Sequence, residues 1–194
     1  MIFSLQGIVQ ELTPTYAIIN VQGVGYYVGI SLMTSQTLTL NHETLIYIQQ
    51  IIREDANLLF GFNSRQEKEM FNLLISVNGV GAVSALILLS TLSLSEIAVA
   101  IMSSNSALIQ KAKGLGTKTA ERIIVDLKDK VQKFGSIEGN ISVPVDNKIK
   151  DEALSALEVL GISKRMSEKI ADRMMKQNPS ISVEELVKQI LKNI

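Results

Sequence analysis

Two short segments of the sequence place glycines on either side of a hydrophobic residue. They are Asn78-Gly79-Val80-Gly81 and Lys113-Gly114-Leu115-Gly116. Glycine permits backbone angles that are closed to other residues, and it leaves no side chain between the backbone and a ligand. A helix that begins directly after such a turn presents unsatisfied N–H groups and the positive end of its dipole, which together attract anions. The two turns therefore predict two phosphate-binding sites.

The two turns belong to one internal repeat. Residues 74–85 line up without gaps with residues 109–120, and both glycines and a later alanine keep their register. The second copy adds hydroxyl groups and cations at Thr117, Lys118, Thr119 and Arg122. Two anion sites of this kind can hold the phosphates of a duplex without reading its bases. The repeat therefore predicts sequence-independent DNA binding.

The charges are distributed unevenly along a chain whose formal net charge is zero. Residues 1–64 contain a single cation, Arg53, against four acidic residues, whereas residues 105–133 contain seven cations against three acidic residues. Such an asymmetry can focus a polyanion on one segment and repel it from another. A lysine-rich solvated helix surface would produce the same counts, so the charge supports DNA binding without requiring it.

The sequence offers no recognisable catalytic or metal-binding constellation. The absence of cysteine excludes a disulfide framework, a thiolate zinc site and a cysteine nucleophile, and His42 is the only histidine. A nucleotide-binding P-loop needs glycine directly before its Lys-Ser/Thr pair, where Thr117 stands. Asp126 lies too close to the second turn to act as a glycosylase acid. We therefore expect no cofactor, no metal and no enzymatic activity.

Two other classes of function remain open at this point. A repair nuclease or glycosylase could use the turns to hold DNA, although the missing active site argues against it. A structural or protein-interaction module could use the glycine turns only to pack helices. DNA cleavage or base release would favour the first alternative, and failure to bind any duplex would favour the second.

The elements around the repeat predict a multidomain α+β protein. Short β-branched and aromatic runs before residue 63 predict five or six strands in a small barrel of the oligonucleotide/oligosaccharide-binding (OB) type. From Asn63-Ser64, a helix-capping pair, the pattern turns helical, as the spacing of Met70, Phe71 and Leu74 indicates. We expect a barrel over 1–63, an all-α tandem helix-hairpin-helix domain over 64–134 and a flexible linker over 135–147.

The last segment, 148–194, predicts three short helices. The third of these begins at the cap Ser182, with Glu185 three residues later as in a capping box. About 45 residues form a small core, so this domain is expected to be marginally stable or stabilised by a partner. The N-terminus lacks the cationic start of a signal peptide, and apolar runs such as 85–89 are too short to cross a bilayer. A cytoplasmic location with no membrane association is therefore expected.

Together these motifs resemble the RuvA family, the Holliday-junction-binding subunits of the bacterial branch-migration complex. The resemblance extends over nearly the whole chain. It rests on Gly23-Val24-Gly25-Tyr26 in the barrel, Arg53-Glu54-Asp55-Ala56 followed by Leu59-Phe60-Gly61-Phe62, and the two glycine turns. The second turn continues with Lys118-Thr119-Ala120-Glu121-Arg122, and this stretch and the acidic hairpin are the most specific parts of the resemblance.

The resemblance implies a concrete function in recombination and DNA repair. Members of this family form tetramers, and in some cases octamers, on an open four-way junction. The acidic residues of a hairpin meet at its centre, a role that here falls to Glu54 and Asp55. The C-terminal domain binds a hexameric AAA+ ATPase like RuvB, and we expect Leu157, Leu160, Gly161 and Ile162 to form that surface. A junction resolvase is a further candidate partner, and a nucleoid-associated location is implied.

The sequence also departs from the family pattern at positions that matter for charge. The first turn usually continues with Pro-Lys, where Ala82 and Val83 stand, and Thr117 replaces a frequent lysine. Ser4 and Gln6 occupy positions where arginine is common. The backbone amides survive these changes, but several phosphate-pairing charges do not. We therefore predict a shallower salt dependence of junction binding than for a lysine-rich relative, since fewer counterions are released.

Overall fold

The computed structural model describes residues 1–134, 149–150, 153–154, 156–158, 161–178 and 181–192. These residues belong to two compact units, Met1–Gly139 and Asn140–Ile194. The expected linker over 135–147 lies outside the described residues.

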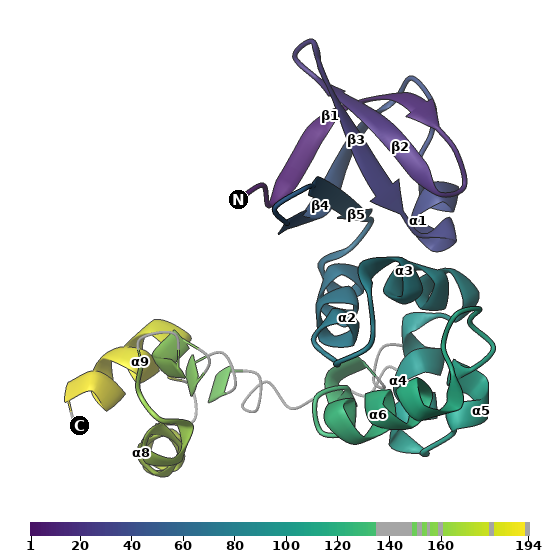
Figure 1. Cartoon of the computed structure of the whole chain (residues 1–194). Coiled ribbons are helices and arrows are strands. Elements are labelled where there is room, and N and C mark those ends of the chain that lie inside the picture. The colour runs from purple at the N-terminus through teal and green to yellow at the C-terminus, as the bar shows by residue number, and fades with distance from the viewer. Residues whose placement is uncertain (135–148, 151–152, 155, 159–160, 179–180, 193–194) are drawn as a thin grey trace. The chain divides into compact units, whose positions relative to one another are not determined.

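The first part of the chain is a closed five-stranded barrel, as predicted. Its strands are β1 (Ser4–Leu12), β2 (Tyr16–Val21), β3 (Val24–Ile30), β4 (Glu43–Ile52) and β5 (Asn57–Phe62). The strand order around the barrel is β1-β2-β3-β5-β4, closed by antiparallel pairing of β4 with β1 (Figure 1). Neighbouring strands are antiparallel except β3 and β5, which pair in parallel. The inward side chains, among them Val9, Ile19 and Ile46, are fully buried.

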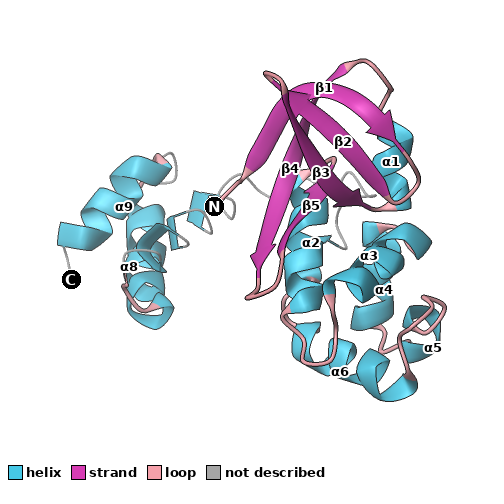
Figure 2. Cartoon of the chain, turned by 45° about the horizontal axis from the view of Figure 1, so that its top comes forward, coloured by secondary structure: helices cyan, strands magenta, loops and turns pink. Residues whose placement is uncertain are grey.

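A short helix inside the barrel segment, α1 (Leu32–Thr37), was not predicted. Its six residues contain only two large apolar side chains, too few to show a helical period. The helix is defined instead by its cap, because the Ser31 hydroxyl accepts a hydrogen bond from the Thr34 amide at 3.0 Å. α1 lies between the barrel and α3 (Figure 2), and its Leu32 amide donates to the Ser90 hydroxyl at 2.9 Å.

The residues from 64 to 134 form a helical layer without strands, again as predicted. Its elements are α2 (Arg65–Ile75), α3 (Ala82–Thr91), α4 (Leu94–Met102), α5 (Ser106–Ile109), α6 (Thr117–Leu127) and the 3-10 turn η1 (Gln132–Phe134). The predicted cap is present, since the Ser64 hydroxyl accepts from the Glu67 amide at 3.1 Å. Met70, Phe71 and Leu74 are completely buried.

Two sets of contacts join the barrel to this helical layer. Aromatic packing is the first, because the Phe71 ring lies 5.3 Å from Phe60 and 4.8 Å from Phe62, centroid to centroid. The end of β5 thereby becomes part of the helical core. The relative position of barrel and helices is thus set by a continuous apolar core.

The second contact is a buried carboxylate. Glu67 is only 6% exposed, and its two oxygens accept hydrogen bonds from the Ser31 hydroxyl at 2.5 Å and the Thr34 hydroxyl at 2.7 Å. The Asn63 amide lies 3.3 Å from the same carboxylate. A buried carboxylate is tolerated when hydrogen-bond donors replace its hydration, so these donors fix α2 against α1.

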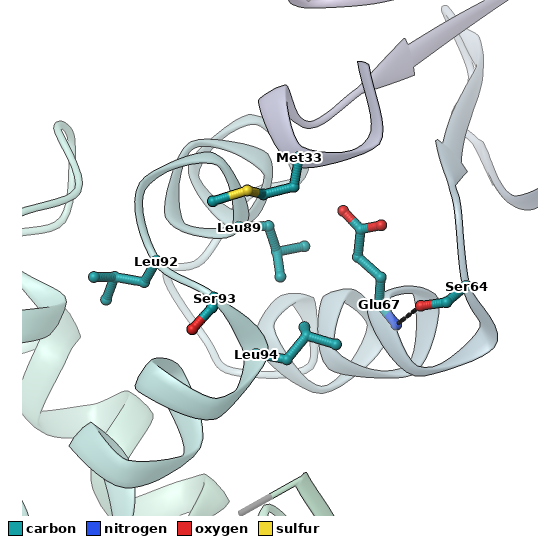
Figure 3. Close-up of a pocket in the computed structure, with 7 residues that line it drawn as sticks. All are labelled: Met33, Ser64, Glu67, Leu89, Leu92, Ser93 and Leu94. Atoms are coloured by element: carbon teal, nitrogen blue, oxygen red, sulfur yellow. Dashed lines mark hydrogen bonds between the residues drawn. The ribbon is translucent and has the colours of Figure 1, made fainter. Parts of the chain in front are cut away.

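A cavity of about 210 Å³ lies beside this carboxylate. Figure 3 shows its lining residues, which are Met33, Ser64, Glu67, Leu89, Leu92, Ser93 and Leu94. The walls are mainly apolar, and the Glu67 carboxylate is already satisfied by the hydroxyls of Ser31 and Thr34. The cavity is therefore a gap between α1 and the helices α2, α3 and α4, and it is separate from the site predicted from the glycine turns.

The second unit is helical in its described residues. It comprises helical residues between 149 and 158, α8 (Lys164–Gln177) and α9 (Val183–Lys192). The predicted cap at Ser182 is present, since its hydroxyl accepts from the Glu185 amide at 3.3 Å. Its small core contains Ala153, Leu154, Leu157, Ala171, Ile181, Leu186 and Ile190.

Candidate nucleic-acid interface

The first glycine turn connects α2 to α3. The Val77 amide donates to the Leu74 carbonyl at 3.1 Å, and the Val80 amide donates to the Val77 carbonyl at 3.0 Å. Gly79 adopts a φ of +92°, and Gly81 caps α3 with φ −84° and ψ 164°. The turn thus spans four residues, and α3 begins immediately after the second glycine.

The second turn has the same backbone geometry. The Ala112 amide donates to the Ile109 carbonyl at 3.2 Å, and the Leu115 amide donates to the Ala112 carbonyl at 3.3 Å. Gly114 has a φ of +95°, and Gly116 caps α6 with φ −78° and ψ 166°. The two copies of the sequence repeat therefore adopt the same backbone conformation in their turns. They differ in the helix before the turn, since α5 has only four residues.

The hydrophobic residue between each pair of glycines anchors its turn. Val80 and Leu115 are each 6% exposed, whereas Asn78 and Lys113 are exposed. Both apolar side chains belong to the core of the helical layer. The turns are thus held from inside while their glycines face outward.

The outward side of both turns is open. A Cβ atom placed on any of the four glycines would meet no atom within 4 Å. No side chain caps α3 or α6. The first-turn N–H groups of both helices are therefore free of a side-chain acceptor, which is the arrangement expected of an anion site.

The two turns differ in charge. After the second turn, Thr117, Lys118 and Arg122 are exposed, and Thr119 is half-buried. The Thr117 hydroxyl donates to the Gln110 side chain at 3.1 Å. After the first turn, Ala82 is buried and Val83 is 67% exposed, so a cation-free surface follows Gly81.

The acidic hairpin is the loop between β4 and β5. The Arg53 amide donates to the Ala56 carbonyl at 2.7 Å, which closes a tight loop whose two central residues are Glu54 and Asp55. Both carboxylates are exposed. The strands that support the loop stay paired up to Ile52 and Asn57, so the two acids stand at the end of a regular ribbon.

The residues expected to bind a partner in the C-terminal unit are not all on its surface. Leu157 is completely buried in the core of that unit, so its side chain serves the fold in this structure. Gly161 is exposed with a φ of +82°, and Ile162 is half-buried. Leu160 lies outside the described residues.

The described surface of this unit also has an apolar groove that the sequence analysis did not predict. It has a volume of about 550 Å³ and is lined by Ala156, Val183, Glu184, Val187, Lys188, Leu191 and Lys192. The spacing of Val183, Val187 and Leu191 along one helical face was visible in the sequence, but periodicity does not tell a core-facing stripe from a partner-facing one.

The described residues contain no cluster of three metal-ligating side chains and no single helix that could span a membrane. Among them, no group of three or more His, Asp or Glu side chains could hold a metal ion. His42 is exposed, with Nδ1 3.0 Å from the Leu40 carbonyl oxygen. In the same part of the chain no single helix is long and apolar enough to span a membrane. The pair α3 and α4 meets that test by length and composition, but with a bend of 102°.

Similar proteins point to one family. Models of the RuvA N-terminal domain, the SAM-like helix-hairpin-helix tandem and the RuvA C-terminal domain match residues 1–61, 71–129 and 148–194. Relatives named Holliday junction branch migration complex subunit RuvA include those of Flavobacterium psychrophilum, 43% identical, and Christiangramia forsetii, 42% identical, with 100% of both chains covered. The relative from Bacteroides fragilis is 38% identical over 201 residues. With three domain models in the expected order and full-length relatives at this identity, the chain belongs to the RuvA family.

Proposed function

We propose that this chain is the non-catalytic subunit that binds four-way DNA junctions, holds them open and recruits a hexameric AAA+ ATPase for branch migration. One observation carries the proposal. The two glycine turns share their backbone angles, and all four glycines face open space. Such a pair of anion sites contacts phosphates rather than base edges, so binding is independent of sequence. The names of the relatives supply the branched substrate.

We propose further that several copies act together, as a tetramer and in some conditions an octamer. A single chain presents two turns, whereas a junction has four arms, so a fourfold arrangement gives each arm its own pair. In that arrangement Glu54 and Asp55 from each copy come together at the crossover. Clustered carboxylates repel phosphates and help to part the strands that enter the junction.

The C-terminal unit is proposed to bind the ATPase motor. Its described surface offers the apolar groove along Val183, Val187 and Leu191, in addition to the expected contacts at Gly161 and Ile162. A small domain joined through a separate segment suits a partner that changes position during each cycle of the motor. A P-loop needs glycine directly before its Lys-Ser/Thr pair, and Thr117 occupies that position here. In this proposal the motor therefore hydrolyses the ATP. We place this complex in the cytoplasm at the nucleoid, with a junction resolvase as a further partner.

A gel-shift comparison of a four-way junction with a linear duplex of equal length tests the proposal. We expect strong preference of the wild-type chain for the junction. Gly116→Asp should weaken junction binding by at least about tenfold, the factor that corresponds to 1.4 kcal/mol. The new carboxylate occupies the free N–H groups of α6 and repels the phosphate. Equal affinity for the two DNAs would reduce the chain to a general duplex binder.

Ser93→Asp provides the matched control. Ser93 caps α4, where its hydroxyl accepts from the Glu96 amide at 3.2 Å, so the variant adds the same charge at a helix start without a glycine turn. Both variants should fold, because aspartate is a favourable cap residue. If Ser93→Asp weakened junction binding as much as Gly116→Asp, the turn would not be the site.

A further inference from the structure

Two cations and two aromatic rings meet where the barrel faces the start of α2. The Lys68 ammonium nitrogen lies 3.8 Å from the centroid of the Phe3 ring. The Arg65 guanidinium carbon lies 5.9 Å from the Phe3 centroid and 5.5 Å from the Tyr47 centroid. The two rings touch edge to face with a centroid distance of 6.3 Å. We call Phe3, Tyr47, Arg65 and Lys68 the cation–aromatic cluster.

The cluster concentrates positive charge in an unfavourable place. Arg65 and Lys68 lie in the first turns of α2, where the helix dipole already favours anions. Lys68 is only 7% exposed, and burial, followed by the neighbouring Arg65 charge, lowers the pKa of its ammonium group. Within the described residues neither cation forms an ion pair. Glu67, the acidic residue in the first turn of α2, directs its carboxylate to Ser31 and Thr34.

These unfavourable features identify what would complete the cluster. A buried cation is ordinarily paired, and two adjacent cations at a helix start repel each other. One anion between them would relieve the repulsion, complement the helix dipole and replace the hydration that burial removes from Lys68. Guanidinium adds the planar donor pair that phosphate oxygens accept. The aromatic rings hold both cations in place before the anion arrives.

We propose that Arg65 and Lys68 bind a backbone phosphate of the DNA, as a third contact in each chain besides the two glycine turns. This inference rests on the proposed junction binding. α2 carries the cluster at its beginning and leads into the first glycine turn at its end. Its 11 residues span about 16 Å, which equals about five base steps of one DNA strand, so the length of the helix permits one strand to contact both sites.

Salt titration of junction binding tests this third phosphate site. In the variant Arg65→Gln/Lys68→Met, glutamine and methionine retain the apolar stems but remove both charges. The slope of log Kobs against log salt should become shallower by about 0.9 for each phosphate that the variant no longer neutralises. The melting temperature should stay the same or rise, because two cations leave the start of α2. A shallower slope together with an undiminished melting temperature distinguishes a phosphate site from a structural cation–π contact.

Lys169→Met/Arg173→Gln is the matched control. Both residues are exposed on α8 in the other unit, so the same two charges are removed away from α2. This control should keep the wild-type slope. A wild-type slope in the Arg65/Lys68 variant, particularly with a lower melting temperature, would overturn the inference and leave the proposed function intact. A wild-type chain that binds no junction would overturn the proposed function itself.

Discussion

Gly79 and Gly114 differ from Gly81 and Gly116 in the reason for which glycine is present. The first two adopt φ values of +92° and +95°, which other residues reach only with strain. The second two have ordinary extended angles and open space around them, so the fold itself would accept a side chain there. Open space at Gly81 and Gly116 is consistent with the proposed close approach of a phosphate.

This difference predicts opposite phenotypes for neighbouring glycines. Gly114→Ala should lower the free energy of unfolding by about 1 kcal/mol, because alanine is strained at positive φ. Gly116→Ser should change it by no more than about 0.5 kcal/mol, since serine is a favourable cap, yet its hydroxyl competes for the N–H groups that a phosphate needs. Urea unfolding and junction titration of both variants measure the two effects. Normal DNA binding by Gly116→Ser would argue against a phosphate at that helix start.

The surface beside the first turn lacks a cation, and a single substitution can add one. Val83 is 67% exposed in the first turn of α3, at a position where the resemblance described above implies lysine. Val83→Lys should therefore steepen the salt dependence of junction binding by about 0.9 in log–log slope for each phosphate that the new lysines neutralise. Val99→Lys, at a 52% exposed site on α4, is the control and should leave the slope unchanged. An identical response of both variants would mean that the added lysine acts only through net charge.

Among the elements, α2 makes the contacts that join the barrel to the helical layer. Its first turn holds the Glu67 carboxylate against the hydroxyls of Ser31 and Thr34, and its buried side places Phe71 against β5. The Glu67 contacts join residues that are far apart in the sequence, the Phe71 contacts join α2 to the strand that precedes it, and both sets lie on one helix. The placement of the turns relative to the barrel therefore depends on α2.

Loss of the buried carboxylate should loosen this connection. Glu67→Ala leaves two buried hydroxyls without their acceptor, and we expect the free energy of unfolding to fall by about 2 kcal/mol. Gln66→Ala, at an exposed position of the same helix, should have little effect. Chemical denaturation of the two variants gives the comparison. Equal stabilities would show that aromatic packing alone holds the barrel.

The sequence predicted the elements better than it predicted their contacts. The barrel strands, the caps at Ser64 and Ser182 and the helices after both glycine turns are confirmed. These features depend on local spacing, which periodicity and capping rules describe. Glu67 was missed as a contact to the barrel because Ser31 and Thr34, its partners, are distant in sequence. The spacing Ser64 to Glu67 indicated only a helix start.

For the whole molecule, charge is separated between the acidic hairpin and the helices that follow the second turn. Glu54 and Asp55 are exposed at the end of the β4–β5 ribbon, whereas Lys118 and Arg122 are exposed on α6. A polyanion is thus attracted by one part of the unit and repelled by another. This separation suits a protein that must hold DNA arms and keep the crossover open.

Neutralising the acidic hairpin should affect junction affinity and the rate of branch migration differently. Glu54→Gln/Asp55→Asn removes the repulsion at the crossover, so junction affinity should stay equal or rise, while the rate of branch migration with the ATPase partner changes. Each carboxylate–phosphate repulsion amounts to about 1 kcal/mol at 4 Å in water. Junction titration and a strand-exchange assay provide the two readings. A loss of affinity beyond about tenfold would contradict the repulsion model.

The position of α2 also has a mechanical consequence. The helix begins at the buried carboxylate and the cation–aromatic cluster and ends at Ile75, two residues before the Val77 that leads into the first turn. Tension on a DNA arm held at that turn would be transmitted along α2, which the side chains of Glu67 and Phe71 join to the barrel segment. Because the same helix contacts the barrel and leads into the first turn, we expect a pull on a bound arm to shift the barrel and the turn together.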